Sequence, residues 1–199
     1  VTGVQTCALP IFLPVESLCA DDFERDAGRW TARDGAVAAR DPAAAASGRY
    51  GLRLFNPRSQ TPFPVSAWST PFNGGRWRFV GFDYRIEGEL RADVLVRTGG
   101  TVRSVRFADG DGVRRMGDPG PVERDGRWHR RFFDLHPMLA AADATARNYE
   151  IADLSFGDTG HLGNVQGQRW HVDDFRVDAI QRGADLVGGD HAVDDLAVD

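Results

Sequence analysis

Short runs of alternating apolar and polar residues recur along the chain, separated by clusters of glycine, proline, aspartate and asparagine. The clearest run is Arg78–Ile86, in which Val80, Phe82, Tyr84 and Ile86 occupy every second position. Successive side chains of a β-strand point to opposite faces, so these apolar side chains share one face. The alternation predicts a strand with one face in the core and the other outside it.

The same β-type composition recurs in further segments bounded by turn residues. They are Trp30–Arg33, Val37–Arg40, Tyr50–Phe55, Val65–Thr70, Ala92–Thr98, Val102–Ala108, Trp128–Leu135, Tyr149–Phe156 and Trp170–Val177. Gly99 and Gly100 predict a two-residue hairpin turn between two of these strands. The break in alternation at Ser104–Val105 predicts a bulge or a bend.

Helical character is confined to one short, alanine-rich segment, His136–Ala146, where Pro137 suits a first helical turn. Many short strands with one minor helix predict an all-β fold, a jelly-roll β-sandwich of two antiparallel sheets. The longest irregular segment is Ala108–Asp125, and loops of that length are usually functional or flexible.

The two ends of the chain are expected to lie outside this module. Val1–Ile11 resembles the translation of a sequencing-library adapter, so the absence of a signal peptide carries no information about export. We expect residues 1–19 to be an adapter scar and linker, and residues 20–178 to form the β-sandwich. The acidic residues 179–199 are either a linker or the start of a following domain.

Composition narrows the classes of function. The net charge is −5, no basic stripe favours nucleic acid, and no basic amphipathic or long apolar helix favours a membrane. All 24 basic residues are arginine, which excludes Schiff-base, P-loop and kinase lysines. Outside the adapter-like segment Cys19 is the single cysteine, which excludes disulfides and thiolate metal sites within the module.

Motifs for catalysis are weak. The histidines show no HxxxH or HExxH spacing, and no G-x-S-x-G elbow is present. Asp109–Gly112 begins like an EF-hand loop, but Gly120 stands where the bidentate acid belongs, so we reject that interpretation. A catalytic carboxylate pair stays open, because nothing singles out one pair among 29 acidic residues.

Four motifs occur in an order that is typical of one architecture. They are Asp21-Asp22-Phe23-Glu24 followed by Gly28-Arg29-Trp30, then Ser47-Gly48-Arg49-Tyr50-Gly51-Leu52-Arg53-Leu54, then Asp125-Gly126-Arg127-Trp128 running on to Asp134-Leu135, and finally Trp170-His171-Val172-Asp173-Asp174-Phe175-Arg176-Val177. Together they resemble the galactose-binding-like jelly rolls of bacterial carbohydrate-binding modules. The resemblance spans about Ala20 to Val177 and is more specific for fold than for function.

The resemblance implies a structural calcium between the first and last strands. Calcium binds hard oxygen ligands from carboxylates and carbonyls. By the match, the ligands would be the carboxylates of Glu24 and Asp173 and carbonyls near Gly48 and Tyr50, with Asp22 or Asp174 as further candidates. The alternative is that these acids are solvated or pair with Arg49 or Arg176.

Sugar binding needs exposed aromatic planes beside polar groups. Trp30, Trp128 and Trp170 lie in the strand motifs and are assigned to the core, whereas Trp68 and Trp77 flank a predicted loop. The candidate carbohydrate-binding residues are Trp68, Trp77, Asp83, Arg85 and Arg97. The alternative is a solvated polar face.

The sequence therefore predicts a non-catalytic carbohydrate-binding module with a structural calcium, within a larger secreted or cell-surface bacterial protein. Its expected partners are a polysaccharide or glycan and other domains of the same chain, with neither nucleic acid nor membrane insertion. Two alternatives stay open: a structural spacer or adhesion domain, and a jelly-roll glycan hydrolase or lyase. Exposed aromatics grouped on one face would favour binding, and a deep pocket of titratable groups would favour an enzyme.

Overall fold

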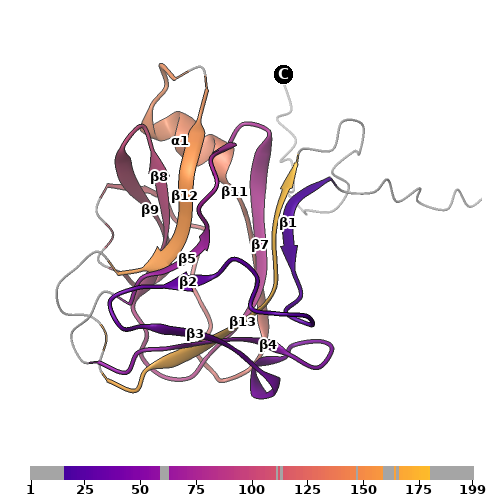
Figure 1. Ribbon diagram of the computed structural model, residues 1–199. Coiled ribbons are helices and arrows are strands. Elements are labelled where there is room, and N and C mark those ends of the chain that lie inside the picture. Colours follow the sequence, from indigo (N-terminus) through magenta and orange to yellow (C-terminus); the bar gives the residue numbers. More distant parts are fainter. Residues whose placement is uncertain are drawn as a thin grey trace, which may run out of the picture.

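Two β-sheets pack face to face, with a short helix at one end (Figure 1). The computed structural model describes residues 16–58, 63–110, 112, 114–146, 148–158, 164 and 166–179. The expectations for Val1–Ile11 and for the chain after Ala179 lie outside the described residues. The described part is the all-β jelly-roll sandwich that the strand pattern predicts.

The first sheet has six strands in the order β11-β7-β13-β4-β3, with β1 beside β13. These strands are β1 (Ser17–Asp21), β3 (Val37–Asp41), β4 (Gly51–Phe55), β7 (Trp77–Ile86), β11 (His129–Asp134) and β13 (Arg169–Ala179). The earliest and latest strands of the described chain are therefore antiparallel neighbours, with Asp21 opposite Phe175.

The second sheet has seven strands in the order β10-β9-β8-β12-β5-β2, with β6 beside β12. These strands are β2 (Thr31–Ala32), β5 (Val65–Trp68), β6 (Phe72–Asn73), β8 (Ala92–Thr98), β9 (Thr101–Ala108), β10 (Arg115–Gly117) and β12 (Glu150–Gly157). A 3₁₀ turn, η1 (Pro42–Ala44), precedes β4. The pairing of β10 with β9 is parallel, so the sheet is antiparallel except at this edge.

The core lies between the sheets and is rich in aromatic rings. Val80, Phe82, Tyr84 and Ile86 are all at most 2% exposed, which confirms the shared face predicted for this strand. Phe156 of the second sheet stands among five rings, whose centroids lie 5.1 to 6.2 Å away and which belong to Trp30, Phe82, Phe107, Trp170 and Phe175. The contact with Trp30 is stacked and the other four are edge-to-face, two geometries that aromatic pairs favour.

The N-terminal edge begins earlier than predicted. β1 starts at Ser17, ahead of the expected boundary at Ala20, because Ser17–Asp21 pairs with β13. The first motif starts at the last residue of β1, Asp21, and its remainder up to Trp30 forms a loop, in which Phe23 has φ 55°. The buried Phe23 ring packs on Trp30 with centroids 5.9 Å apart, so the motif contributes to the core without forming a strand.

The predicted hairpin and bulge both occur. Gly99 and Gly100 have φ of 53° and 74° between the paired residues Thr98 and Thr101, as a type I′ turn requires. The bulge lies just after the predicted position, because two residues of β8 span three of β9 between Val105 and Ala108.

Helix α1 (Leu135–Ala142) is shorter than predicted and starts one residue earlier. The Asp134 side chain accepts a hydrogen bond from the His136 backbone N–H at 2.9 Å and caps the start. The helix ends before Ala146 because the Asp143 carboxylate binds the hydroxyl and backbone N–H of Thr145. Local side-chain bonds of this kind compete with helical ones.

Two further expectations are corrected. The segment Ala108–Asp125 is not wholly irregular, because β10 interrupts it. Trp128 is not a core residue: it is half-buried, its ring faces Arg85 at 5.2 Å, and its centroid lies 6.4 Å from that of His171. Both partners lie on the outer face of the first sheet, since they alternate with core residues of β7 and β13.

Candidate functional site

The predicted carbohydrate-binding residues do not form one cluster. Asp83 and Arg85 lie on the outer face of β7 in the first sheet. Arg97 lies on β8 in the second sheet, opposite Asp153 of β12. The core separates these two faces, so a single sugar site cannot use all three residues.

The two predicted tryptophans do not offer free ring faces. Trp68 is 5% exposed, its indole N–H donates to the Thr70 carbonyl at 2.7 Å, and the Arg29 guanidinium lies 4.3 Å from its ring centroid. Trp68 is the last residue of β5, within the predicted strand, and it does not present the exposed ring expected of a sugar-binding residue. Trp77 is half-buried against the core, with the Arg76 guanidinium 4.8 Å from its ring.

A groove of about 330 Å³ crosses the outer face of the second sheet. We call it the polar groove and define it by Arg33, Ser66, Leu95, Arg97, Val102, Asp153 and Ser155. The strand register arranges the side chains in rows. Ser155 lies opposite both Ser66 and Leu95, and Arg97 lies opposite both Asp153 and Val102. These residues alternate with the core residues Val94, Val96, Leu154 and Phe156, which places them on the outer face.

A hydrogen-bonded network fixes one side of the polar groove. The Ser66 hydroxyl donates to Asp153 Oδ1 at 2.7 Å, and Arg33 Nη2 lies 3.8 Å from the same oxygen. The Asp153 side chain is 12% exposed, whereas the Arg33 side chain is 56% exposed. The carboxylate is thus held in place while the guanidinium can meet a ligand.

The groove offers several kinds of contact. Arginines donate hydrogen bonds, carboxylates accept them, and serine hydroxyls do both. Leu95 and Val102 add an apolar surface, and none of the described residues that line the groove is aromatic. The lining holds two arginines and three aspartates, so the opposite charges nearly balance. Such a surface can hydrogen-bond a neutral ligand with many hydroxyl groups, but its described lining lacks the exposed aromatic plane expected of a sugar site.

Of the groove residues, sequence reasoning identified Arg97 alone. The alternation Asp153-Leu154-Ser155-Phe156 could have placed Asp153 and Ser155 on an outer face. It could not have shown that Ser66 lies beside them, because 87 residues separate the partners of that hydrogen bond. Strand pairing decides this, and one sequence does not encode it locally.

Asp83 and Arg85 are both engaged by neighbours on the first sheet. Arg130 binds the Asp83 carboxylate through two nitrogens at 2.6 and 2.8 Å. Arg85 donates to His171 Nδ1 at 3.3 Å and to the Ala43 carbonyl at 2.6 Å. Burial, together with the nearby Arg85 charge, lowers the pKa of His171 to about 4.

The predicted calcium residues Glu24 and Asp173 converge on one loop. Glu24 Oε1 accepts the backbone N–H groups of Arg49 and Tyr50 at 2.7 and 3.0 Å. Asp173 Oδ2 accepts those of Ala46 and Ser47 at 2.7 and 3.1 Å. The closing strand and the segment after β1 are therefore tied to residues 46–50. Gly48 has φ 65°, and a Cβ there would overlap Glu24 Oε1, so a larger residue would strain the backbone and displace this carboxylate.

The remaining predicted ligands point elsewhere. Asp22 Oδ1 accepts the Glu24 backbone N–H at 3.1 Å, and Asp174 Oδ2 lies 3.6 Å from Arg130 Nη2. The Tyr50 ring lies under the Arg40 guanidinium at 3.5 Å. Arg40 also donates to the backbone carbonyls of Phe23 and Glu24.

The donor set fits calcium in chemical type but leaves few oxygens free. Asp173 is fully buried, and this burial raises the pKa of its carboxyl group, whereas the backbone N–H groups of Ala46, Ser47 and Asp174 act in the opposite direction. Backbone N–H groups of Arg49 and Tyr50 lower the pKa of Glu24. Within the described ranges, no three acidic, histidine or cysteine side chains are grouped closely enough to hold a metal. A calcium here would depend on these two carboxylates and on carbonyls.

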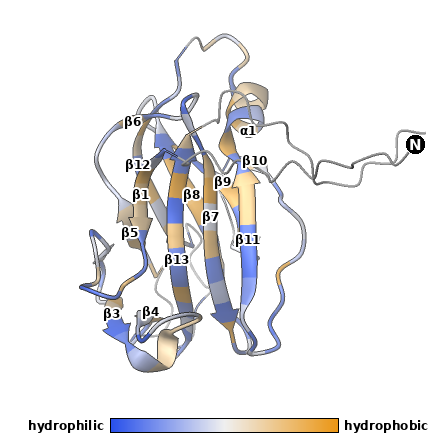
Figure 2. Cartoon of the chain, turned by 90° about the vertical axis from the view of Figure 1, so that its right-hand side faces the viewer, coloured by the Kyte–Doolittle hydropathy of each residue, from blue (hydrophilic) through white to orange (hydrophobic). Residues whose placement is uncertain are grey.

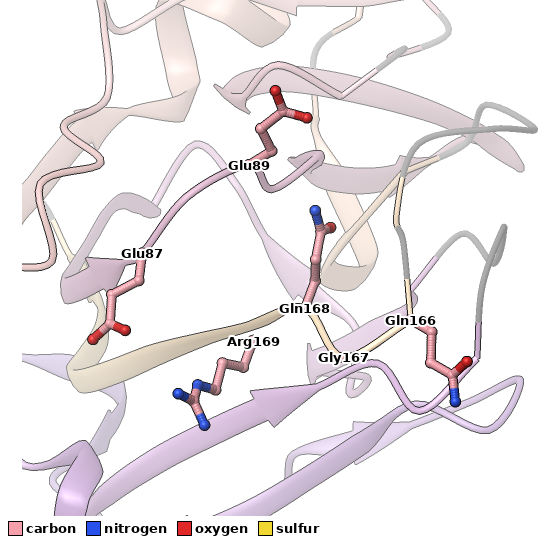
Figure 3. Close-up of a pocket in the computed structure, with 6 residues that line it drawn as sticks. All are labelled: Glu87, Glu89, Gln166, Gly167, Gln168 and Arg169. Carbon is pink, nitrogen blue, oxygen red and sulfur yellow. The ribbon is translucent and has the colours of Figure 1, made fainter.

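A second hollow, of about 460 Å³, lies where β7 ends and β13 begins. Glu87, Glu89, Gln166, Gln168 and Arg169 line it together with Gly167. Figure 3 shows that the carboxylates of Glu87 and Glu89 point in different directions. These two acids therefore do not form the facing pair that glycoside hydrolysis uses.

The described part of the chain contains no helix with the length and apolarity needed to cross a membrane. Its α-helix, α1, has 8 residues.

Fold and groove together define a jelly-roll β-sandwich with a polar groove on one outer face. No protein-family model and no curated protein matches the sequence. Among solved structures, the chain is similar to a xylan-binding domain of carbohydrate-binding module family 22 from Paenibacillus barcinonensis, with 12% identity and a TM-score of 0.47 over 84% of this chain and 97% of that one.

Two further structures show similar agreement. A family 11 carbohydrate-binding module from Clostridium thermocellum matches with 12% identity and a TM-score of 0.44, over 86% of this chain and 99% of that one. A glycoside hydrolase domain structure from Streptococcus pneumoniae matches with 14% identity and a TM-score of 0.44, over 74% of this chain and 21% of that one. With TM-scores below 0.5, these similarities carry no functional conclusion for this chain.

Proposed function

We propose that the β-sandwich is a non-catalytic carbohydrate-binding module whose ligand lies in the polar groove. The observation that carries this proposal is the arrangement of hydrogen-bonding side chains across adjacent strands of the second sheet. The Ser66 hydroxyl donates to Asp153 Oδ1, and Arg33 Nη2 lies 3.8 Å from the same oxygen, so the position of the carboxylate is set before a ligand arrives. Binding to preorganised groups costs less conformational entropy.

A glycan matches the groove better than an anionic ligand does. Each sugar hydroxyl both donates and accepts hydrogen bonds, as Ser66 and Ser155 do, and the C–H faces of a sugar ring suit Leu95 and Val102. An anionic ligand would need an excess of positive charge, but the aspartates among the lining residues outnumber the arginines. Neutral polysaccharides are therefore the ligand class that we propose.

The wider setting is also a proposal. A binding module without chemistry of its own works by holding a partner domain near a polysaccharide. We place this one in a larger bacterial protein that is secreted or displayed at the cell surface, on the strength of the four sequence motifs. A glycan-active partner domain is compatible with this proposal and would not make the module an enzyme.

The first experiment is a glycan array with the whole chain. We expect retention of one or more neutral oligosaccharides by the unaltered protein. Arg97→Ala should weaken the affinity about tenfold, the cost of one lost hydrogen bond to a charged group. The matched control is Arg127→Ala, which removes an arginine whose side chain is 83% exposed and does not line the groove.

Two results would count against the groove. If the chain retains no glycan on the array, the spacer alternative is favoured. If Arg97→Ala and Arg127→Ala bind equally well, the ligand lies elsewhere. Release of shortened products from the retained glycans would instead favour the hydrolase alternative.

We further propose that a structural calcium lies between Glu24 and Asp173. The support is the full burial of the Asp173 carboxylate and the convergence of both acids on residues 46–50. The ion would offset the repulsion between two carboxylates on neighbouring segments. The Glu24 side chain would contribute to the site through the oxygen that accepts no N–H group in the described structure.

Chelation tests the calcium proposal. In a calcium concentration about 100 times the Kd, binding adds about 2.7 kcal/mol to the free energy of unfolding, so a chelator should lower Tm by about 5–10 °C. Glu24→Gln keeps an acceptor for the Arg49 and Tyr50 N–H groups but removes the charge. We expect its Tm to be insensitive to the chelator. An unchanged Tm in the unaltered chain would mean that backbone N–H groups alone satisfy the two acids.

A further inference from the structure

One large apolar side chain stands out from the described surface. Phe132 of β11 is 53% exposed, and Val37, the next such residue, is 37% exposed. The Phe132 ring stacks on Phe79 of β7, with centroids 5.5 Å apart and an angle of 15° between the ring planes. We call these two rings the phenylalanine pair. Stacking on Phe79 leaves part of the Phe132 ring facing solvent.

The pair lies on the outer face of the first sheet, away from the polar groove. Phe132 lies opposite Gly81, and Phe79 lies opposite Asp134. A Cβ at Gly81 would lie 3.2 Å from Phe132 Cδ2 and 3.5 Å from Arg176 Nε, so the absent side chain lets both groups approach the sheet. In Figure 2, β11 changes from hydrophilic at its start to hydrophobic near α1.

The charges around the pair are already matched. On the same face, Asp83 is bound by Arg130 at 2.6 Å, Asp134 is bound by Arg78, and Asp178 Oδ2 lies 3.3 Å from Arg176 Nε. The face therefore carries little net charge near the rings. The paired carboxylates and guanidinium groups can each make further hydrogen bonds, and the ion pairs fix the orientation of these groups.

A flat apolar ring beside fixed donors and acceptors fits the two sides of a sugar ring. The C–H faces of a pyranose are apolar and its rim is made of hydroxyl groups. We propose that the phenylalanine pair is a stacking platform for a neutral polysaccharide, separate from the polar groove. The platform does not need the groove to bind, because the two surfaces lie on different sheets.

The size of the apolar surface argues against a second copy of the chain as the occupant. A stable protein interface buries about 800 Å² on each partner. A phenylalanine supplies at most about 150–250 Å². Val37 is on β3, at the opposite edge of the sheet, so it does not enlarge the patch around the pair. Two rings match the footprint of a sugar chain better than that of a folded partner.

The test compares insoluble polymers with soluble oligosaccharides, using the whole chain. The probes are microcrystalline cellulose, insoluble xylan and insoluble mannan in a depletion assay, with the soluble oligosaccharides of the same sugars measured by calorimetry. We expect Phe132→Ala to reduce the affinity for at least one polymer about tenfold. Phe132→Tyr, which keeps the ring, should retain it. The matched control Val37→Ala removes an exposed apolar side chain from the same face and should bind as the unaltered chain does.

The outcomes separate this platform from the groove. Arg97→Ala should weaken the binding of soluble oligosaccharides and keep the platform-dependent binding of polymers, whereas Phe132→Ala should weaken polymer binding and keep the binding of soluble oligosaccharides. The platform is overturned if no polymer is retained, if Phe132→Ala binds as before, or if Val37→Ala loses as much. Sedimentation of the same variants tests whether a second copy of the chain occupies the phenylalanine pair instead. A concentration-dependent dimer that Phe132→Ala abolishes would assign the pair to self-association and contradict the proposal.

Discussion

His171 is held neutral by its surroundings. It lies 5% exposed on β13, where burial and the Arg85 guanidinium lower its pKa to about 4. Because Arg85 donates to Nδ1 at 3.3 Å, the proton of the neutral ring belongs on Nε2. A second proton would have to enter a buried position beside a fixed positive charge. This histidine therefore makes folding depend on pH.

The sign of that dependence follows from the depressed pKa. Between pH 6.5, the ordinary value, and pH 4, the unfolded chain binds a proton at this histidine and the folded chain does not. Stability should fall as pH falls through this window, by about 3 kcal/mol in total for this residue. Chemical denaturation at several pH values measures it.

The comparison variant is His171→Gln, which can accept from Arg85 but does not titrate. Its free energy of unfolding should lose this part of the pH dependence, whereas His136→Gln should keep it. Parallel curves for the unaltered chain and His171→Gln between pH 7 and 4 would show that the imidazole is not held neutral.

Gly51 illustrates a second constraint at the residue scale. It opens β4 directly beside η1, and a Cβ there would overlap the backbone carbonyl of Ala44 and lie 3.1 Å from the Val172 carbonyl oxygen. Backbone atoms cannot rotate away as side chains do. We expect Gly51→Ala to destabilise the fold by about 3 kcal/mol, measured by urea denaturation.

The control for this variant is Gly120→Ala. Gly120 has φ 95° and no neighbouring atom within 4 Å of a Cβ, so it reports the backbone cost alone, about 1 kcal/mol. Equal losses in the two variants would mean that β4 and η1 are not packed as described.

Residue-scale detail was the hardest to predict from sequence. The alternation in Arg78–Ile86 identified its buried side chains correctly, because burial of one strand face follows a period of two. Trp68 lies in its predicted strand but is not exposed as a sugar-binding residue would be, because Arg29 packs on its ring and its indole N–H bonds to the Thr70 carbonyl. Phe132 was not singled out, since its exposure depends on Gly81 of a partner strand.

At the scale of elements, the pairing of β1 with β13 joins the ends of the described chain. Cys19 lies in the middle of β1 opposite Val177, and burial raises the pKa of its thiol to about 12. The Ala179 N–H bonds to the Glu16 carbonyl at 2.9 Å and the Ser17 hydroxyl to Asp178 at 2.6 Å. The thiol therefore reports whether β1 is docked.

Thiol labelling measures this docking. With Cys7 replaced by serine, Cys19 is the remaining cysteine. Since the thiolate fraction falls tenfold for each unit by which the pKa exceeds pH, Cys19 should react about a thousandfold more slowly than a free thiol at pH 8. In urea it should react at the ordinary rate. Fast labelling under native conditions would show that β1 is undocked or opens readily.

Elements were predicted better than their ends. All ten predicted strands overlap observed strands, because alternation and turn residues mark them locally. β1, β6 and β10 were not predicted. β6 and β10 are two or three residues long, and β1 depends on its pairing with β13. The helix ended early because Asp143 bonds to Thr145, a local contact that alanine content does not reveal.

At the scale of the whole molecule, the two sheets separate candidate site residues that the sequence could not separate. Asp83, Arg85 and Arg97 were predicted as one site, yet the core lies between β7 and β8. By contrast, Glu24 and Asp173 do meet on residues 46–50, because their motifs are attached to neighbouring strands. Which residues share a face follows from sheet order, and sheet order follows from long-range pairing.

The most direct test of glycan binding in the polar groove is chemical-shift mapping with a soluble oligosaccharide retained on the array. Binding in the groove predicts that the largest amide shifts fall on Ser66, Arg97 and Ser155, in neighbouring strands of the second sheet. Amides of β3 and β4 in the first sheet should not move. Shifts confined to the first sheet, or none at saturating sugar, would contradict it.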